Sequence, residues 1–387
     1  MKVALFQRFF AAYQGGLVKA LRRSAENTYI FFGDENDAMG TGIEPHSFAG
    51  DGDFRKTRTR HFTAAVAWQG GAITAALGSD FDVIILEGNC WMPSNWIAIG
   101  CARLTGKKVI LYTHGWLQPE TGCRKMIRNL FYHRADVLAL YGDRAKRIGL
   151  ETGFVDERMV VVHNSLDYDR IAERRDRVTR EECAALRTRL FGADGPQPLL
   201  VCIGRLTRAK QLDLLIPAAA VLAARGLRVN LLLIGSGPEE AALREKAASA
   251  GMRVHFAGAI SDETGIARYL AAAELAVIPG AAGLTVIHCL AYGLPVVTHD
   301  RTDLQPPEAE AVIAGRTGCL FQHGNEVSLA DAIESALRQL PKSEKTRDDC
   351  IRLVEQSYHP ARMADAFDAA VRAAGIGIKP GPNASNT

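Results

Sequence analysis

The feature that most constrains the fold is the alternation of short apolar runs with longer helical segments along nearly the whole chain. Many of these runs are continuously apolar, which is expected of parallel strands buried on both faces of a sheet. The segments between them, such as Gln211–Ala224 and Glu239–Ala248, have helical periodicity and many helix formers. The alternation therefore predicts an α/β protein with two series of β-α-β units and two doubly wound parallel sheets.

The expected strands fall into two series along the chain. Those of the first series are Lys2–Phe6, Thr28–Phe32, Val83–Leu86, Lys108–Tyr112, Val137–Tyr141 and Met159–His163. Those of the second series are Leu199–Ile203, Val229–Ile234, Val254–Ala257, Leu275–Ile278, Pro295–Thr298 and Cys319–Phe321.

Composition along the chain predicts where the domains begin and end. An N-terminal Rossmann-like domain is expected over residues 1–168 and a C-terminal one over residues 197–356. Residues 169–196 between them are dense in Arg and Glu, which predicts a linker helix. A last helix is expected over residues 357–374, and whether it crosses back to the first domain is left open. The Gly/Pro-rich tail over residues 375–387 is expected to be disordered.

The charge balance excludes some partners and leaves others open. A net charge of +3 is too mild to indicate a nucleic-acid-binding protein. Basic residues do cluster in the N-terminal half, at residues 55–60, 124–128 and 144–147. Solvated surface explains such clusters, and a face that meets an anionic membrane or acceptor is the alternative.

The expected location follows from the cysteines and the apolar segments. The chain has 8 cysteines without a C-x-x-C pair, which favours free thiols in a reducing compartment. We expect neither a signal peptide nor a transmembrane helix. The expected location is therefore the cytoplasm, with peripheral association at the inner face of the cytoplasmic membrane as an extension of that expectation.

The strongest chemical signal is a glycine followed by two cations at the end of an expected buried strand. Gly204 and Arg205 follow Ile203, and Lys210 comes five residues after the arginine. Arginine offers a planar fork to phosphate and lysine a point charge, so the pair suits a departing diphosphate. Two basic residues after a strand are, taken alone, more often plain surface.

The motifs that follow reduce the weight of the surface interpretation. Leu232–Pro238 is a strand that runs into a tight turn, but the third glycine of a dinucleotide-binding fingerprint is missing. It is followed by Val254–Gly258, Tyr269–Leu275, Gly283-Leu284-Thr285 and Ala291–Val297. In this order, over most of residues 198–340, the chain resembles the retaining GT-B glycosyltransferases of glycosyltransferase family 4.

This resemblance implies a fold and a set of site residues. The fold is GT-B, in which two Rossmann-like domains face a central cleft. Arg205 and Lys210 match the family's donor-diphosphate cations, and Gly15-Gly16 matches the N-terminal glycine turn that approaches the donor phosphates. Gly283, Leu284 and Thr285 match the loop and helix start whose backbone amides face the sugar and phosphates.

The chain departs from the family at one important place. The family usually carries two glutamates eight residues apart, and the alignment puts Gly280 and His288 at these positions. The second glutamate normally receives the ribose hydroxyls, whereas a neutral imidazole has one acceptor nitrogen. Two interpretations of His288 stay open: a ribose-binding group, or a structural histidine whose bonds are satisfied within the protein.

The N-terminal half offers candidates for the acceptor side. His114 follows an apolar strand and precedes a glycine, where active sites form in such sheets, so it is a candidate catalytic residue. A structural histidine is the alternative at that position. Asn89 and Trp91 follow another strand and are candidate acceptor-binding residues, with ordinary core packing as the alternative.

The function expected from these observations is transfer of a sugar from a nucleotide-diphosphate sugar, with retention, to a glycan or lipid-linked acceptor in surface polysaccharide synthesis. The resemblance implies front-face displacement assisted by the leaving phosphate. No cofactor or metal is expected, since no Asp-x-Asp motif stands in a suitable place. The alternatives are a non-catalytic nucleotide-sugar-binding subunit and a GT-B-like nucleotide-sugar epimerase.

Overall fold

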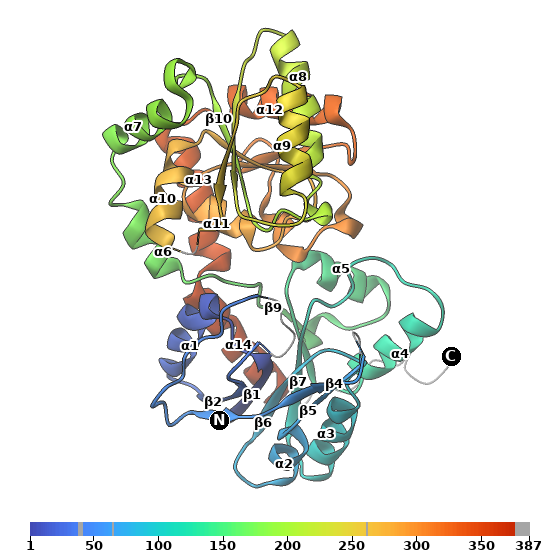
Figure 1. Ribbon diagram of the computed structural model, residues 1–387. Helices are drawn as coiled ribbons and strands as arrows, with labels where there is room; N and C mark the ends of the chain where they lie inside the picture. The colour runs from blue at the N-terminus through green and yellow to red at the C-terminus, as the bar shows by residue number, and fades with distance from the viewer. Residues whose placement is uncertain (38–41, 64–65, 261, 376–387) are drawn as a thin grey trace. The chain divides into compact units, whose positions relative to one another are not determined.

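The computed structural model describes residues 1–37, 42–63, 66–260 and 262–375 (Figure 1). The chain divides into two compact units. Unit 1 comprises Met1–Asp167 together with the segment that begins at His359, and unit 2 comprises Tyr168–Tyr358. From residue 376 onward, the tail expected to be disordered lies outside the described residues.

Unit 1 is built on a parallel sheet whose strand order is β3-β2-β1-β6-β7-β8-β9. Its strands are β1 Lys2–Phe9, β2 Thr28–Asp34, β3 Phe54–Lys56, β6 Val83–Glu87, β7 Lys108–Thr113, β8 Val137–Leu140 and β9 Met159–Val161. A short antiparallel pair stands apart from this sheet, β4 Thr59–His61 and β5 Ala67–Gln69.

Helices cover both faces of the unit 1 sheet. They are α1 Gly15–Arg22, α2 Ala72–Leu77, α3 Pro93–Leu104, α4 Gly122–Tyr132, α5 Asp143–Glu151 and α14 Pro360–Gly375. Alternate residues of β1 enter two different cores because successive side chains of a strand point to opposite faces. Ala4 and Phe6 pack with α2, α3 and α4, whereas Val3 and Leu5 pack with α1 and α14.

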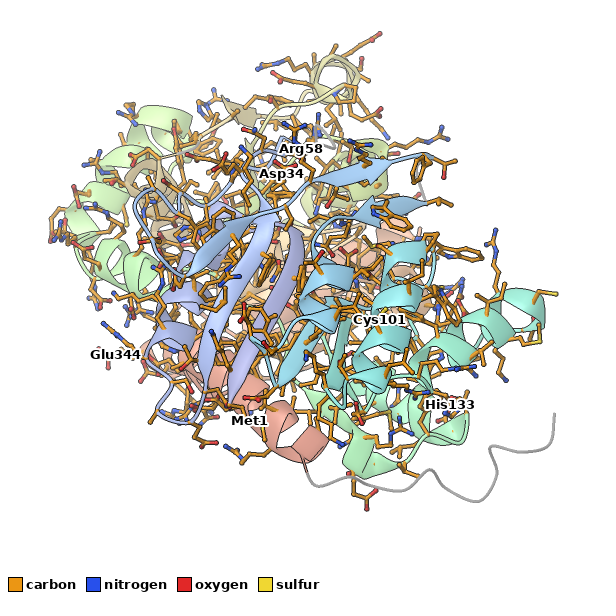
Figure 2. The ribbon with its side chains drawn as sticks, turned by 90° about the horizontal axis from the view of Figure 1, so that it is seen from below. Met1, Asp34, Arg58, Cys101, His133 and Glu344 are labelled. Atoms are coloured by element: carbon orange, nitrogen blue, oxygen red, sulfur yellow. The ribbon has the colours of Figure 1, made fainter. Side chains whose placement is uncertain are left out.

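The parallel strands of this sheet all begin at one edge, the amino edge, and end at the opposite one, the carboxyl edge. Met1 and Asp34 lie at opposite ends of the β1–β2 part of the sheet, with Arg58 on the same side as Asp34 (Figure 2). The carboxyl ends of the parallel strands therefore meet at the edge marked by Asp34, where ligands bind in sheets of this kind.

Unit 2 is built on a second parallel sheet, in the order β12-β11-β10-β13-β14-β15. Its strands are β10 Leu199–Ile203, β11 Asn230–Ile234, β12 Val254–Gly258, β13 Leu275–Ile278, β14 Val296–His299 and β15 Gly318–Phe321. Its helices are α6 Tyr168–Arg175, α7 Arg180–Phe191, α8 Leu215–Ala224, α9 Glu240–Ser249, α10 Glu263–Ala272, α11 Thr285–Ala291, α12 Glu326–Gln339 and α13 Glu344–Leu353.

The predicted fold class is confirmed: both units are Rossmann-like and doubly wound, and a strand forms at every apolar run predicted to be one. The prediction missed β3, β4 and β5, which are three residues long and lack an apolar run. Among the described residues, no helix combines the length and the apolar character needed to cross a bilayer.

The prediction of a single linker helix over residues 169–196 is wrong. This segment forms α6 and α7, two helices that pack against α10 and belong to unit 2. Leu186 and Phe191 are buried there, and the Arg187 side chain bonds Glu274 and the Gly195 carbonyl. The many charged residues of this segment indicated a linker, although the few buried residues of α7 anchor it to unit 2.

The C-terminal helix α14 is held in unit 1 by one buried carboxylate. Asp368 accepts hydrogen bonds from Ser24 Oγ at 2.7 Å, Asn27 Nδ2 at 2.7 Å and Tyr29 OH at 2.8 Å. Burial and the neighbouring Asp368 raise the pKa of Tyr29, so the phenol stays protonated as the donor. The carboxylate therefore joins residues from the two ends of the chain.

Replacing this carboxylate tests its contribution to stability. We expect Asp368→Ala to lower the free energy of unfolding by at least about 3 kcal/mol, since each hydrogen bond to a charged group contributes about 1.5–3 kcal/mol. Asp365→Ala is the matched control, because the Asp365 side chain is 68% exposed and surface pairs contribute little. Urea unfolding followed by circular dichroism measures both, and equal losses would contradict this role of Asp368.

Candidate functional site

The loop after β10 carries the two predicted phosphate-binding cations. Gly204 takes a φ of 138°, which favours glycine, and its N–H donates to Ile234 O at 2.9 Å. Arg205 is exposed directly after it, and the loop reaches Lys210 through a short 3-10 turn. The strand end thus fixes the start of the loop while leaving the arginine at the surface.

Lys210 lies beside the start of α11. Its Nζ donates to Ala281 O at 2.6 Å, in the loop between β13 and α11. An ideal Cβ built on Gly204 would lie 3.6 Å from Lys210 Cε and 3.8 Å from Thr285 Oγ1. The structure therefore brings Gly204, Lys210 and Thr285 together, with Arg205 adjoining them in the same loop.

Glycines on the neighbouring loops make room for this arrangement. A Cβ at Gly235 would lie 1.9 Å from Gly204 O, and one at Gly237 would lie 2.2 Å from Leu206 O. Real Cβ atoms do not approach a carbonyl so closely. The Gly-x-Gly turn after β11 is therefore explained by its close packing against the cation loop rather than by a dinucleotide.

The same packing explains one of the two missing glutamates. A Cβ at Gly280 would lie 2.1 Å from Ala209 O and 2.6 Å from the Lys210 carbonyl carbon. No side chain fits at this position while the cation loop keeps its path. The first glutamate of the family pattern is thus excluded by local packing in this chain.

Two polar residues missed by the sequence analysis support the loop that contains Gly283. Gln305, buried at 3% exposure, accepts from Ala282 N at 2.9 Å and donates to Thr298 Oγ1 at 2.8 Å. Glu308 is also buried, and its Oε2 would lie 3.9 Å from a Cβ at Gly283. A carboxylate therefore does stand near the predicted donor loop, but it comes from the segment after β14.

His288 is bonded within unit 2. Its Nε2 lies 2.8 Å from Glu263 Oε1, and Tyr292 OH donates to the same oxygen at 2.7 Å. Burial raises the pKa of Glu263, but the bonds from His288 and Tyr292 and the nearby Arg170 outweigh it and hold the pKa below its ordinary value. In this conformation His288 Nε2 is engaged with Glu263 and is not available to a ribose hydroxyl.

Unit 1 contains a cavity of about 570 Å³ at the carboxyl ends of β1, β6 and β7. The predicted residues His114, Asn89 and Trp91 all line it. The His114 ring stacks on Tyr141, with 4.2 Å between ring centroids and 12° between planes. Asn89 Oδ1 accepts from Trp91 N at 2.9 Å, which orders the loop after β6.

The same cavity holds polar groups that were not predicted as site residues. Glu87 is paired with Arg8 at 2.8 Å. Burial raises the pKa of the Glu87 carboxyl, and Arg8 opposes this rise only in part. Gln7 also lines the cavity, and its Nε2 is buried without a hydrogen-bond partner among the described residues. Aromatic walls with a few polar groups are typical of small-molecule sites.

The glycine pair Gly15-Gly16 begins α1 and adjoins the cavity through Gln14, which lines it. A Cβ at Gly16 would lie 2.9 Å from Pro360 Cγ, and one at Gly15 would lie 3.2 Å from the His46 ring. The pair therefore has a packing role in unit 1, whatever ligand it meets.

Comparison with known proteins is consistent with this geometry. Residues 197–339 match the family model described as "Glycosyl transferases group 1". A GDP-mannose-dependent alpha-(1-6)-phosphatidylinositol dimannoside mannosyltransferase of Mycobacterium tuberculosis is 32% identical over 206 residues, 52% of this chain and 50% of that protein. An alpha-D-kanosaminyltransferase of Streptomyces kanamyceticus is 26% identical over 207 residues, 52% of each chain. The chain thus spans about half the length of the curated relatives it matches.

The solved structures extend the likeness to both units. HepE of Anabaena, solved in complex with UDP, matches with a TM-score of 0.68 at 16% identity, over 96% of this chain and 100% of that one. The fold is therefore that of the GT-B class, with two Rossmann-like domains. The match to the glycosyl transferases group 1 family model is confined to residues 197–339, within unit 2.

The packing argument for Gly280 predicts a difference between two neighbouring glycines. We expect Gly280→Ala to lower the free energy of unfolding by about 1–3 kcal/mol, because overpacking forces the backbone apart. In Gly283→Ala the new methyl would meet nothing nearer than 3.8 Å, so this control is expected to stay close to the parent. Thermal unfolding measures both, and equal effects would argue against the close approach.

Proposed function

We propose that the protein is a glycosyltransferase that moves a sugar from a nucleotide-diphosphate sugar to a glycan or lipid-linked acceptor. The observation that carries this proposal is the cation loop after β10. In this loop Lys210 lies close to Thr285, Arg205 is nearby, and all three residues are within the region that matches the family model. In this proposal unit 2 binds the donor and unit 1 binds the acceptor.

The chemistry proposed for the donor is cleavage of the bond between the sugar's anomeric carbon and the diphosphate oxygen. Arg205 and Lys210 would neutralise the charge that develops on the departing diphosphate, which is where preorganised cations have most effect. Their fixed charge also supports the proposal that no metal is needed. A chelator is therefore expected to leave turnover unchanged.

The proposed route is retaining. The acceptor oxygen attacks the anomeric carbon on the face that the diphosphate leaves, and a phosphate oxygen of the leaving group takes the acceptor proton. His114 is proposed to position the reacting hydroxyl, since its ring is held against Tyr141 in the unit 1 cavity. The anomeric coupling constants of donor and product, read by proton NMR, test the stereochemistry.

The cation loop predicts a graded loss of donor binding. We expect Arg205→Ala and Lys210→Ala each to weaken nucleoside-diphosphate binding about 10- to 150-fold, the equivalent of about 1.5–3 kcal/mol for a charge-assisted contact. Calorimetric titration with UDP, GDP and ADP also identifies the base. Arg208→Ala is the matched control, since Arg208 is exposed in the same loop.

Two outcomes separate this proposal from its alternatives. Nucleotide binding that depends on Arg205 and Lys210 without product from any acceptor would favour a non-catalytic binding subunit. Conversion of the donor in the absence of an acceptor would favour an epimerase. Absence of binding by every nucleotide would remove the basis of the proposal.

The acceptor class follows from the surface of unit 1 and from the lipid-linked substrate named for the mycobacterial relative. Ile97 and Leu104 of α3 are 46% and 87% exposed, and Met126 and Leu130 of α4 are 65% and 48% exposed. The two helices are in contact, since the Trp96 and Phe131 rings pack with their centroids 4.9 Å apart and their planes tilted by 50°. We call these four exposed side chains the α3–α4 apolar face and propose that they act together.

Exposed cations lie on or beside the same two helices, and only part of the predicted basic clusters contributes to them. Arg103, Arg124 and Arg134 are exposed on or beside these helices, which complements an anionic bilayer. Arg128 is instead paired with Glu120 at 2.8 Å, and Arg144 is buried at 8% exposure. We propose that the α3–α4 apolar face rests on the anionic lipid surface that presents the acceptor.

Vesicle binding tests this part of the proposal. We expect the protein to sediment with phosphatidylglycerol-containing vesicles, and less so in high salt, since surface charge attraction is screened. Leu104→Glu with Met126→Glu is expected to abolish sedimentation. The control is Leu304→Glu, because Leu304 is a similarly exposed apolar residue of unit 2, at 49%. Unchanged sedimentation of the double variant would overturn the assignment of this face.

A further inference from the structure

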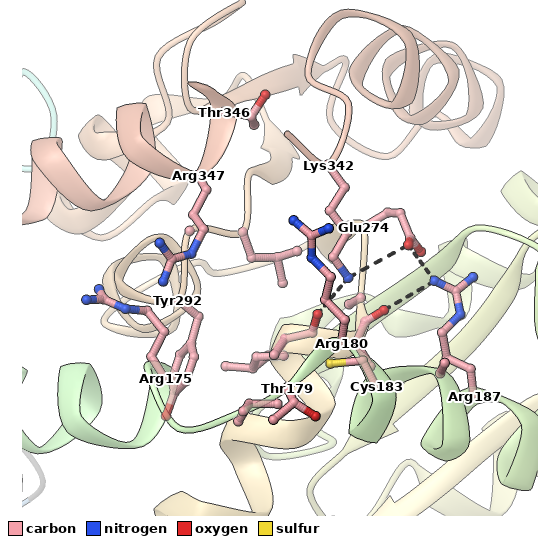
Figure 3. A pocket seen from close by; sticks show the side chains of 18 of the residues that line it. Arg175, Thr179, Arg180, Cys183, Arg187, Glu274, Tyr292, Lys342, Thr346 and Arg347 are labelled. Carbon is pink, nitrogen blue, oxygen red and sulfur yellow. Dashed lines mark hydrogen bonds and ion pairs between the residues drawn. The ribbon is translucent and has the colours of Figure 1, made fainter. Parts of the chain in front are cut away.

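Unit 2 contains a second cavity, of about 1030 Å³, that the donor-binding groups do not line. It lies among α7, the start of α13 and the segments that precede β10, β13 and β14 (Figure 3). The cation loop and Gly283 follow β10 and β13, so they lie at the carboxyl edge of the sheet. The cavity therefore lies at the amino edge, and a ligand bound there would occupy a separate site.

Cations outnumber acids around this cavity. The basic residues that line it are Arg175, Arg180, Arg187, Lys342 and Arg347. Asp176, Glu274 and Glu344 are the acids that line it. Arg187 is paired with Glu274, and Arg347 is paired with Asp176 at 3.2 Å.

The Glu274 carboxylate is shared by two of these cations, since both Arg187 and Lys342 pair with it. Lys342 Nζ donates to the Ala271 carbonyl at 2.6 Å and stands 3.9 Å from Glu274. The Arg180 guanidinium has no hydrogen-bond or ion-pair partner among the residues described, and it extends from α7 into the same space (Figure 3). Burial lowers the pKa of Lys342 below its ordinary value, and the nearby Glu274 opposes this only in part. An anion in the cavity would offset this unfavourable charge environment.

The remainder of the wall combines apolar residues with the hydroxyl-bearing residues Thr179, Thr188, Ser343 and Thr346. Val178, Leu270, Leu294 and Pro295 contribute to it, together with alanines at the end of α10. A cavity with apolar side chains and a small number of polar groups fixes a ligand in one orientation. The ligand suited to this lining carries an anionic group joined to an apolar body.

We propose that this cavity is a binding site for a small phosphate- or carboxylate-bearing molecule with an apolar body, held by Arg180 and Lys342. The anionic group lies between these two side chains, and the apolar body lies against Leu270 and Leu294. This site shares no lining residue with the proposed donor site, and it lies at the opposite edge of the sheet.

The test uses phenyl phosphate as the probe and the full chain carrying Arg205→Ala and Lys210→Ala. This background removes the proposed diphosphate contacts, so the result does not depend on the proposed function. We expect saturable binding in calorimetric titration, and no binding of benzyl alcohol, which has a similar apolar body without the charge. Absence of saturable binding by phenyl phosphate, or equal binding of benzyl alcohol, would overturn the proposal.

Cavity variants then locate the bound probe. We expect Arg180→Ala with Lys342→Met to weaken binding at least about tenfold, as loss of charge-assisted contacts does. Arg189→Ala with Lys345→Met is the matched control, because Arg189 is exposed on α7 like Arg180, Lys345 is exposed three residues after Lys342, and neither lines the cavity. Equal weakening by the two pairs, or none by the cavity pair, would overturn the proposal.

A second measurement needs no change in the cavity. Cys183 lines it, whereas Cys123 is exposed in unit 1. Phenyl phosphate is expected to slow alkylation of Cys183 by iodoacetamide, read by peptide mass spectrometry, and to leave Cys123 unaffected. Equal rates at Cys183 with and without the probe would contradict the proposed site even if the double variant failed to fold.

Discussion

The close approach of three loops at the carboxyl edge of the unit 2 sheet determines where the donor-binding groups lie. The loop from Gly204 to Lys210 passes so near the turns after β11 and β13 that only glycine fits at 235, 237 and 280. Since the backbone fills this space, Lys210 reaches the Ala281 carbonyl and the start of α11. The position of Lys210 thus depends on the glycines at 235, 237 and 280, because a side chain at any of them would collide with the loop.

The carboxylates found around α11 and the loop before it do not stand at the two positions of the family pattern. Gly280 has no room for one, and His288 carries an imidazole where the family pattern has the second glutamate. Glu263 from the start of α10 bonds His288, and Glu308 after β14 stands near Gly283. Of these two carboxylates, Glu308 stands near the loop that contains Gly283, whereas Glu263 is bonded to the later part of α11.

The sequence was sufficient to predict the apolar strands of both sheets, but not the short strands β3, β4 and β5. Leu199–Ile203 and Leu275–Ile278 form strands with the predicted bounds, because each is a short apolar run ended by Gly204 or Pro279, which interrupt regular structure. The bond between Glu263 and His288 joins residues 25 apart on different helices, and no local pattern predicts such a pair. The linker prediction failed for a related reason, since the buried residues of α7 are few and its exposed residues dominate the composition.

Helix α11 is held at both of its ends, which connects the two edges of the unit 2 sheet. At its start, Thr285 lies beside Gly204 and Lys210. At its end, Arg175 donates to the Ala291 carbonyl at 2.8 Å, and both Arg175 and Tyr292 line the basic cavity. Tyr292 in turn bonds Glu263, the partner of His288. Helix α11 therefore has one end beside the cation loop and the other beside the basic cavity.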